Sequence, residues 1–149
     1  MKRLLIALAL GLTTLTVPAV ALAAKAPIYT APFSNVAVGG YDAVSFFSGK
    51  PVKGSAQFQT NWKGATWQFA NAADLTKFKA NPAAYAPQYG GYCAWAAADG
   101  RTAPGDPNFW RVVGGKLYLN YNADIQSKWL KDVPGFIKKA DANWPAILN

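Results

Sequence analysis

Apolar and polar residues alternate in residues 57–70. Phe58 and Trp62 precede the dipeptide Lys63-Gly64, and Trp67 and Phe69 follow it. Alternation of this kind is typical of strands that are buried on one face, and a short break containing glycine is typical of a tight turn. We therefore expect two short antiparallel strands in this stretch.

Residues 110–121 contain the clearest hairpin pattern in the chain. An apolar run beginning at Trp110 and a second one, residues 116–121, are separated by Gly114-Gly115. Glycine adopts positive φ without steric cost, as hairpin turns require. Residues 101–108, which contain two prolines and a glycine, are predicted to form a loop.

Residues that favour helix starts precede apolar stretches at four places: Asp42, Asn71, Asn122 and Pro134. A fifth short helix is predicted in the alanine-rich residues 92–98, with Gly100 as its C-terminal stop. The fold class is therefore α+β, a single domain in which a small antiparallel sheet of short hairpins is surrounded by several short helices. We find no internal repeat in the pattern.

The N-terminus has the pattern of a cleaved signal peptide. A basic start at Lys2-Arg3 is followed by an apolar stretch and by Ala21-Leu22-Ala23, an A-x-A cleavage site. A membrane anchor is the competing interpretation, but threonines, a glycine and a proline interrupt the apolar stretch. We predict a signal peptide at 1–23, an extended lead-in at 24–35, one domain at 36–149, and export to a bacterial periplasm. No later segment is apolar enough to be a transmembrane segment.

The chain has a formal net charge of +8, but its cations are spread along the sequence. Nucleic-acid binding requires a clustered basic patch, so we expect no nucleic-acid partner. A solvated basic surface is the simpler interpretation, and attraction to an anionic lipid or polymer is the alternative.

Missing residue types restrict the chemistry. The sequence contains no His and no Glu, and its single Met is the initiator. This composition excludes a catalytic triad with histidine, a histidine-rich zinc or copper site, and a glycosidase pair of two glutamates. The aspartates lie beside turns and predicted helix starts, where carboxylates commonly cap the backbone.

The stretch 89–100 combines two adjacent glycines, the single cysteine and large aromatic side chains. Six of its residues are candidates for a ligand pocket: Tyr89, Gly90, Gly91, Tyr92, Cys93 and Trp95. A helix beginning at Cys93 would lower the pKa of its thiol and favour the thiolate. The other interpretation of Cys93 is a small buried apolar residue among alanines.

Motifs along nearly the whole chain after residue 35 resemble the exported branch of the YHS-domain proteins. These motifs are Gly40-Tyr41-Asp42-Ala43-Val44, Gly64-Ala65-Thr66-Trp67-Gln68-Phe69, Phe78 with Asn81-Pro82-Ala83-Ala84-Tyr85, Tyr89-Gly90-Gly91-Tyr92-Cys93-Ala94, Gly115-Lys116-Leu117-Tyr118-Leu119-Asn120-Tyr121 and Lys139-Ala140-Asp141-Ala142-Asn143-Trp144-Pro145.

The resemblance implies a YHS-like domain without implying an activity. Some YHS domains resemble heavy-metal-binding modules whose ligands are cysteines after an Asp-Pro-Val element and in an aromatic second strand. This chain has Ser45 near the first position and no cysteine in Trp67-Gln68-Phe69-Ala70, so those ligands do not transfer. Cys93 is the one thiol available to a metal, and the sequence contains no complete set of ligands around it.

Our first functional hypothesis is a non-enzymatic periplasmic binding or accessory module. Its partner would be a small ligand or another periplasmic protein, with the pocket around residues 89–95. The alternative is a thiol-dependent redox or metal-handling protein that uses Cys93, with a metal site completed by another subunit in the second case. The cofactor and the ligand are not identified by the sequence.

Overall fold

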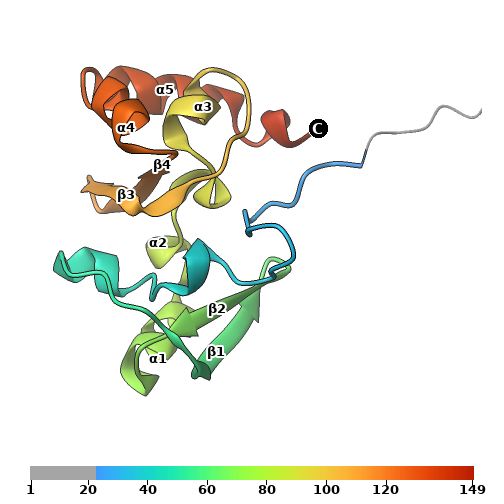
Figure 1. Ribbon diagram of the computed structural model, residues 1–149, viewed down its shortest axis with the longest axis vertical. Helices are drawn as coiled ribbons and strands as arrows, with labels where there is room; N and C mark the ends of the chain where they lie inside the picture. The colour runs from blue at the N-terminus through green and yellow to red at the C-terminus, as the bar shows by residue number, and fades with distance from the viewer. Residues whose placement is uncertain (1–22) are drawn as a thin grey trace, which may run out of the picture.

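The computed structural model describes residues 23–149 (Figure 1). The predicted signal peptide lies outside the described residues apart from Ala23. The predicted α+β fold is confirmed: two antiparallel two-stranded sheets are accompanied by short helices.

The first half of the fold, residues 38–85, forms the lower part of the molecule in Figure 1 and is called the first unit. Its elements, in order, are 3-10 helices at Val38–Gly40 and Ser45–Ser48, strands β1 (Ser55–Trp62) and β2 (Ala65–Phe69), and helices α1 (Ala72–Ala80) and α2 (Pro82–Tyr85).

The second unit, residues 88–143, forms the upper part of the molecule in Figure 1. Its elements are a 3-10 helix at Gln88–Gly91, helix α3 (Ala94–Ala98), strands β3 (Asp106–Val113) and β4 (Lys116–Asn120), and helices α4 (Ala123–Trp129) and α5 (Val133–Asn143). A 3-10 helix at Ala146–Leu148 ends the chain.

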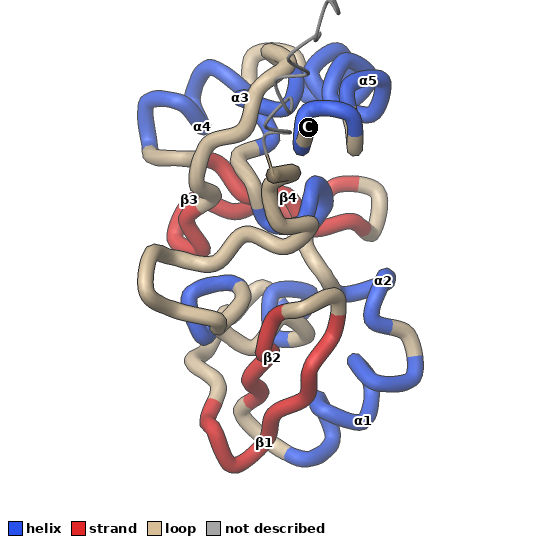
Figure 2. The backbone as a smooth tube through the Cα atoms, turned by 90° about the vertical axis from the view of Figure 1, so that its right-hand side faces the viewer, coloured by secondary structure: helices blue, strands red, loops and turns tan. Residues whose placement is uncertain are grey.

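The two units are copies of one arrangement, which corrects the expectation of no internal repeat. Each strand of the second unit begins and ends 51 residues after its counterpart in the first. Figure 2 shows a hairpin next to helices in both halves. Residues identical at this spacing include Gly39 and Gly90, Gly40 and Gly91, Tyr41 and Tyr92, Gly49 and Gly100, Gly54 and Gly105, Gly64 and Gly115, Asn71 and Asn122, and Lys77 and Lys128.

Matching hydrogen bonds accompany the matching elements. The backbone N–H of Asp42 donates to the Val52 carbonyl at 2.9 Å, and the N–H of its counterpart Cys93 donates to the Ala103 carbonyl at 2.9 Å. The side chains of Asn71 and Asn122 accept a backbone N–H three residues later, at 2.8 and 2.9 Å, and so begin α1 and α4 as predicted. The repeat was hidden in the sequence because mainly turn and cap residues are identical.

The predicted hairpins are both present. The register of each is shifted near its start, between Ser55 and Gln59 in β1 and between Asp106 and Trp110 in β3. The prediction of a loop over residues 101–108 is therefore wrong for its last three residues, which belong to β3. Pro107 lies in the irregular part of that strand, where a missing N–H is tolerated.

Strand β4 separates two hydrophobic cores. Leu117 and Leu119 lie in the core of the first unit, whereas Tyr118 lies in the second core and packs on Trp129 with ring centroids 5.5 Å apart. Successive side chains of a strand point to opposite faces, so one strand contributes to both cores. The two units are therefore joined by packed side chains as well as by the polypeptide between them.

Candidate functional site

The loop Tyr89-Gly90-Gly91-Tyr92 is covered by the N-terminal lead-in. The N–H of Tyr29 donates to the Gly90 carbonyl at 2.9 Å, and the hydroxyl of Tyr92 donates to the Ala26 carbonyl at 2.9 Å. The rings of Tyr29 and Tyr92 lie 5.4 Å apart. The lead-in thus lies against the domain and occupies the surface beside these glycines.

The expected single pocket around residues 89–95 is divided in the structure among three. Gly91 lines a cleft between the two units, Cys93 and Trp95 line a pocket of the second unit, and Tyr89 and Gly90 line a third pocket near the C-terminus. Tyr92 is buried under the lead-in and lines none of these three. The six candidates therefore do not line a single cavity.

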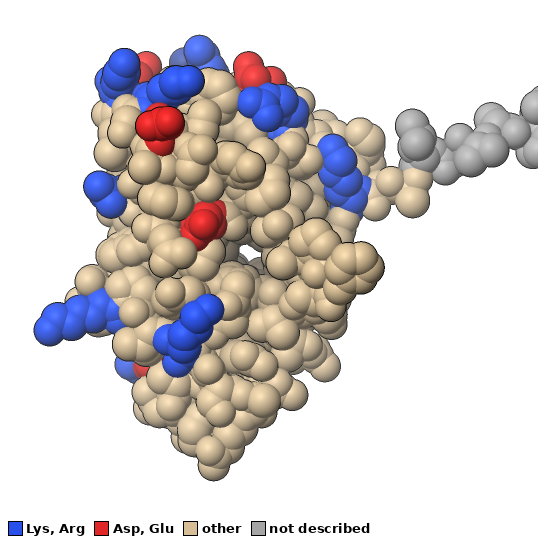
Figure 3. All heavy atoms as spheres, in the orientation of Figure 1, with Lys and Arg blue, Asp and Glu red and all other residues tan. Residues whose placement is uncertain are grey.

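The largest of these cavities, about 610 Å³, is the cleft between the units. On the face drawn in Figure 3 the surface is hollowed between the two halves. The first unit contributes Val38, Gly39, Tyr41 and Lys53, while the second contributes the start of β3, the end of β4 and Tyr121. Tyr29 of the lead-in joins them, so three separate parts of the chain form the walls.

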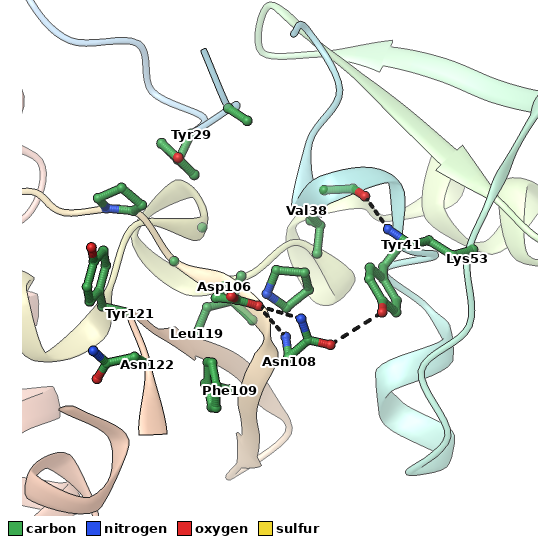
Figure 4. Close-up of a pocket in the computed structure, with 16 residues that line it drawn as sticks. Tyr29, Val38, Tyr41, Lys53, Asp106, Asn108, Phe109, Leu119, Tyr121 and Asn122 are labelled. Carbon is green, nitrogen blue, oxygen red and sulfur yellow. Dashed lines mark hydrogen bonds between the residues drawn. The ribbon is translucent and has the colours of Figure 1, made fainter. Parts of the chain in front are cut away.

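A series of hydrogen bonds runs along the cleft (Figure 4). The Lys53 ammonium donates to the Gly39 carbonyl at 2.8 Å and lies 4.1 Å from the centre of the Tyr41 ring. The Tyr41 hydroxyl donates to the side-chain oxygen of Asn108 at 3.4 Å, and so joins the first unit to the second. Asn108 in turn donates its backbone and side-chain N–H groups to Asp106 Oδ1, at 2.8 and 2.9 Å.

These contacts leave polar groups available to a ligand. The hydrogen bonds found among residues 23–149 use only one carboxylate oxygen of Asp106, and the Lys53 ammonium has one acceptor for its three donors. Aromatic rings lie around them: those of Tyr29, Tyr41, Phe109 and Tyr121. Tyr121 is 50 % exposed, so half of its side chain is open to solvent and to a ligand.

The cleft has the general make-up of a small-molecule site. Such sites combine aromatic walls with a few polar groups that orient the ligand, and their volumes are on the order of 300–1,000 Å³. Figure 4 shows Tyr41 and Lys53 on one side and Asp106, Phe109 and Tyr121 on the other. A polar ring could contact aromatic faces on both walls while bonding to Asp106 and Asn108.

Cys93 is buried, with 1 % of its surface exposed, and occupies the N-cap position of α3 without a capping hydrogen bond from its side chain. Burial raises the pKa of its thiol, although the backbone N–H groups of Ala96, Tyr121 and Trp95 and the charge of Arg101 act in the opposite direction. The thiol lies 3.8 Å from the side-chain oxygen of Asn120, to which it donates. The thiol is therefore neutral at pH 7, in agreement with the interpretation of Cys93 as a small buried residue and not with the interpretation of a lowered pKa.

In the first unit the position of Cys93 is taken by Asp42. The Asp42 carboxylate is fully buried and accepts the backbone N–H groups of Val44, Ser45 and Ala70 at 2.9, 3.3 and 3.0 Å. Burial raises the pKa of Asp42, and its backbone hydrogen bonds counteract this effect. The backbone N–H groups that act on Cys93, those of Trp95, Ala96 and Tyr121, lie 51 residues after the three that bond to Asp42.

Within residues 23–149, His, Cys, Asp and Glu side chains do not gather in groups of three that could hold a metal ion. The same part of the chain contains no helix with the length and apolar character needed to cross a membrane. Comparison with models of protein families, with curated proteins and with solved structures found no match. The resemblance to YHS-domain proteins therefore stays a prediction.

The residues that line the cleft were missed in the sequence, except for Gly91. Tyr41 lay in a recognised motif, but nothing in the pattern marked Lys53, Asp106 or Asn108 as neighbours of Tyr41. One signal was available: Gly39-Gly40-Tyr41 repeats as Gly90-Gly91-Tyr92 at the spacing of the units. A search for that spacing would have drawn attention to both loops.

Proposed function

We propose that the protein is a non-enzymatic binding module of the exported YHS type, which takes a small polar ring, such as a sugar unit, in the cleft between its units. The observation that carries this proposal is the cleft itself, about 610 Å³, with four aromatic rings around Asp106, Asn108 and Lys53. Hydroxyl groups of a sugar match the free carboxylate oxygen and the amide, and its C–H faces match aromatic rings.

The proposal is tested by isothermal titration of the mature protein with a panel of neutral mono- and oligosaccharides. Binding of at least one of them is expected. Tyr121→Ala should weaken that binding about tenfold, the equivalent of roughly 1.4 kcal/mol, because it removes an exposed aromatic wall. Asp106→Asn should weaken it similarly, since a carboxylate oxygen accepts more strongly than an amide oxygen.

Asp124→Asn is the matched control for Asp106→Asn, because Asp124 is an exposed aspartate that lines none of the cavities described above. This control should bind like the unmodified protein. The absence of heat with every sugar in the panel, or an equal effect of both aspartate variants, would overturn the proposal.

We also propose that the protein acts in the periplasm. The N-terminal pattern of residues 1–23 supports this location. Expression of the full chain in a Gram-negative bacterium, followed by cell fractionation and N-terminal sequencing, tests it. A mature chain in the periplasmic fraction that begins at Ala24 is expected, and an uncleaved chain in the cytoplasm would contradict it.

A further inference from the structure

A pocket occurs at the same place in both units. The pocket of the second unit, about 300 Å³, is lined by Cys93, Trp95, Ala96, Arg101, Ala103, Tyr121, Asn122 and Ile125. The counterparts of Trp95, Ala96, Arg101, Ala103 and Ile125 are Val44, Ser45, Lys50, Val52 and Asp74, and all five line a pocket of the first unit. Recurrence in two halves of different sequence shows that the backbone arrangement creates this hollow.

Basic side chains occupy equivalent positions beside the two pockets. Lys50 corresponds to Arg101, and Lys77 corresponds to Lys128. Arg101 and Lys128 both lie over the ring of Trp95, at 5.5 and 5.8 Å from its centre. Each unit therefore has two basic side chains beside the equivalent pocket.

The acidic groups of the two pockets differ. In the first unit Asp74 pairs with Lys77 at 3.3 Å, and the buried carboxyl of Asp42 accepts hydrogen bonds from the lining residues Val44 and Ser45. In the second unit their positions are taken by Ile125 and Cys93, which are neutral. Carboxyl groups at these two positions thus offset the basic side chains of the first pocket. The second pocket has uncharged residues at both positions.

The charge of Arg101 is only partly balanced. Its Nε donates to Asp99 Oδ2 at 2.9 Å, and both side chains are more than half exposed. Among the hydrogen bonds of residues 23–149, the two terminal amino groups of Arg101 have no acceptor. A guanidinium presents these donors side by side, which is the geometry that binds a carboxylate through two hydrogen bonds.

We infer that the pocket of the second unit binds a small organic anion, a carboxylate with an apolar body. The carboxylate pairs with Arg101 beside Lys128, and the apolar body lies against Trp95, Ala103 and Ile125. This site is separate from the cleft proposed for a sugar, although Tyr121 and Asn122 line both cavities.

The experiment uses benzoate as the probe and benzamide as its uncharged analogue, in titrations of the mature protein followed by Trp fluorescence and calorimetry. Benzoate should bind at least tenfold more tightly than benzamide. Arg101→Gln should remove most of this difference, and Lys50→Gln, which makes the same kind of change at the equivalent position of the first unit, should leave it unchanged.

The variant Ile125→Asp gives the second pocket the aspartate that the first pocket has at the equivalent position, Asp74. Because Asp74 occupies this position in the first unit near the start of α1, an aspartate is compatible with the helix, and thermal unfolding verifies that the variant folds. The variant should weaken benzoate binding at least tenfold.

Equal binding of benzoate and benzamide, no binding of benzoate, or equal losses in Arg101→Gln and Lys50→Gln would overturn the inference. Asp106→Asn should affect sugars and leave benzoate binding unchanged, so the two proposals fail independently.

Discussion

The loops Gly39-Gly40-Tyr41 and Gly90-Gly91-Tyr92 have the same backbone but different surroundings. In both, the three residues before the tyrosine have positive φ: 53°, 58° and 79° for residues 38–40, and 55°, 62° and 85° for residues 89–91. The second loop is covered by lead-in residues 26–29 and reaches the cleft only through Gly91, whereas both Gly39 and Tyr41 of the first loop line the cleft. Equivalent sequences therefore serve mainly as a packing surface for the lead-in in the second unit and as a wall of the cleft in the first.

The comparison shows that a glycine-rich loop does not by itself indicate a ligand site. Both loops have the residue types that permit close approach, and in the second loop the approaching group is the chain's own Pro27. Gly39 instead lies against the side chain of Pro107. The neighbours of a loop decide its role, and those neighbours come from distant parts of the sequence.

The largest expected effect separates the two loops directly. In Gly90→Ala the new Cβ would collide with the Pro27 carbonyl and lie 3.3 Å from Ile28 Cα, so the lead-in would have to move. We expect a loss of about 3 kcal/mol or more in the free energy of unfolding. In Gly39→Ala the Cβ would meet only the ring of Pro107, with Cγ at 3.4 Å and Cδ at 3.8 Å, and the loss should be about 1 kcal/mol from backbone strain. Urea unfolding at pH 7 measures both losses. Equal losses would contradict the conclusion that the lead-in packs tightly on the second loop and not on the first.

A second test compares Asp42 with Cys93, its counterpart in the second unit. Asp42→Ala removes the acceptor of three buried backbone N–H groups and should cost about 3 kcal/mol of unfolding free energy. Cys93→Ala removes a weak hydrogen-bond donor and a small buried volume and should cost about 1 kcal/mol. Urea unfolding of both variants checks this order. A larger loss for Cys93→Ala would mean that the thiol contributes more than packing.

The raised pKa of Cys93 predicts a pH dependence. Above the usual thiol pKa of 9.0 the unfolded chain ionises while the folded thiol stays protonated, so stability that is fully present below pH 9 is lost as the pH rises. The loss is at most about 1.4 kcal/mol per pH unit. Because burial also raises the pKa values of Tyr89, Tyr92 and Tyr118, the contribution of Cys93 is measured as the difference between the unmodified protein and Cys93→Ala from pH 8 to 10.

Alkylation with iodoacetamide at pH 7.5 is the companion measurement. The buried neutral thiol should react only after denaturation, detected by mass spectrometry. Complete modification of the native protein would favour the thiol-dependent alternative over a binding module.

The smallest expected effect should be equal in the two units. Asn71→Ala and Asn122→Ala each remove one side-chain acceptor from a helix start and should cost about 1 kcal/mol. Thermal unfolding of the two variants measures this. Losses that differ severalfold would show that the caps are not equivalent, in spite of their matching hydrogen bonds.

Local chemistry explains how much of the fold was predictable. The hairpins follow from alternation and from Lys63-Gly64 and Gly114-Gly115, which have positive φ at both turn positions. The caps at Asn71 and Asn122 depend on atoms three residues away. The strand at Asp106–Val113 was predicted only in part, because its first residues pair irregularly with a distant partner.

The sequence by itself determined the element types, the α+β class and the restricted chemistry of a chain without His or Glu. The tertiary structure alone decided that Tyr41, Lys53, Asp106 and Asn108 share a cleft, and that Cys93 is buried where the first unit has Asp42. Turns and caps depend on neighbours within a few residues, so a pattern can reveal them. Cavities and burial depend on which distant surfaces pack together, and two loops with the same residues and the same backbone acquire different roles when different segments cover them.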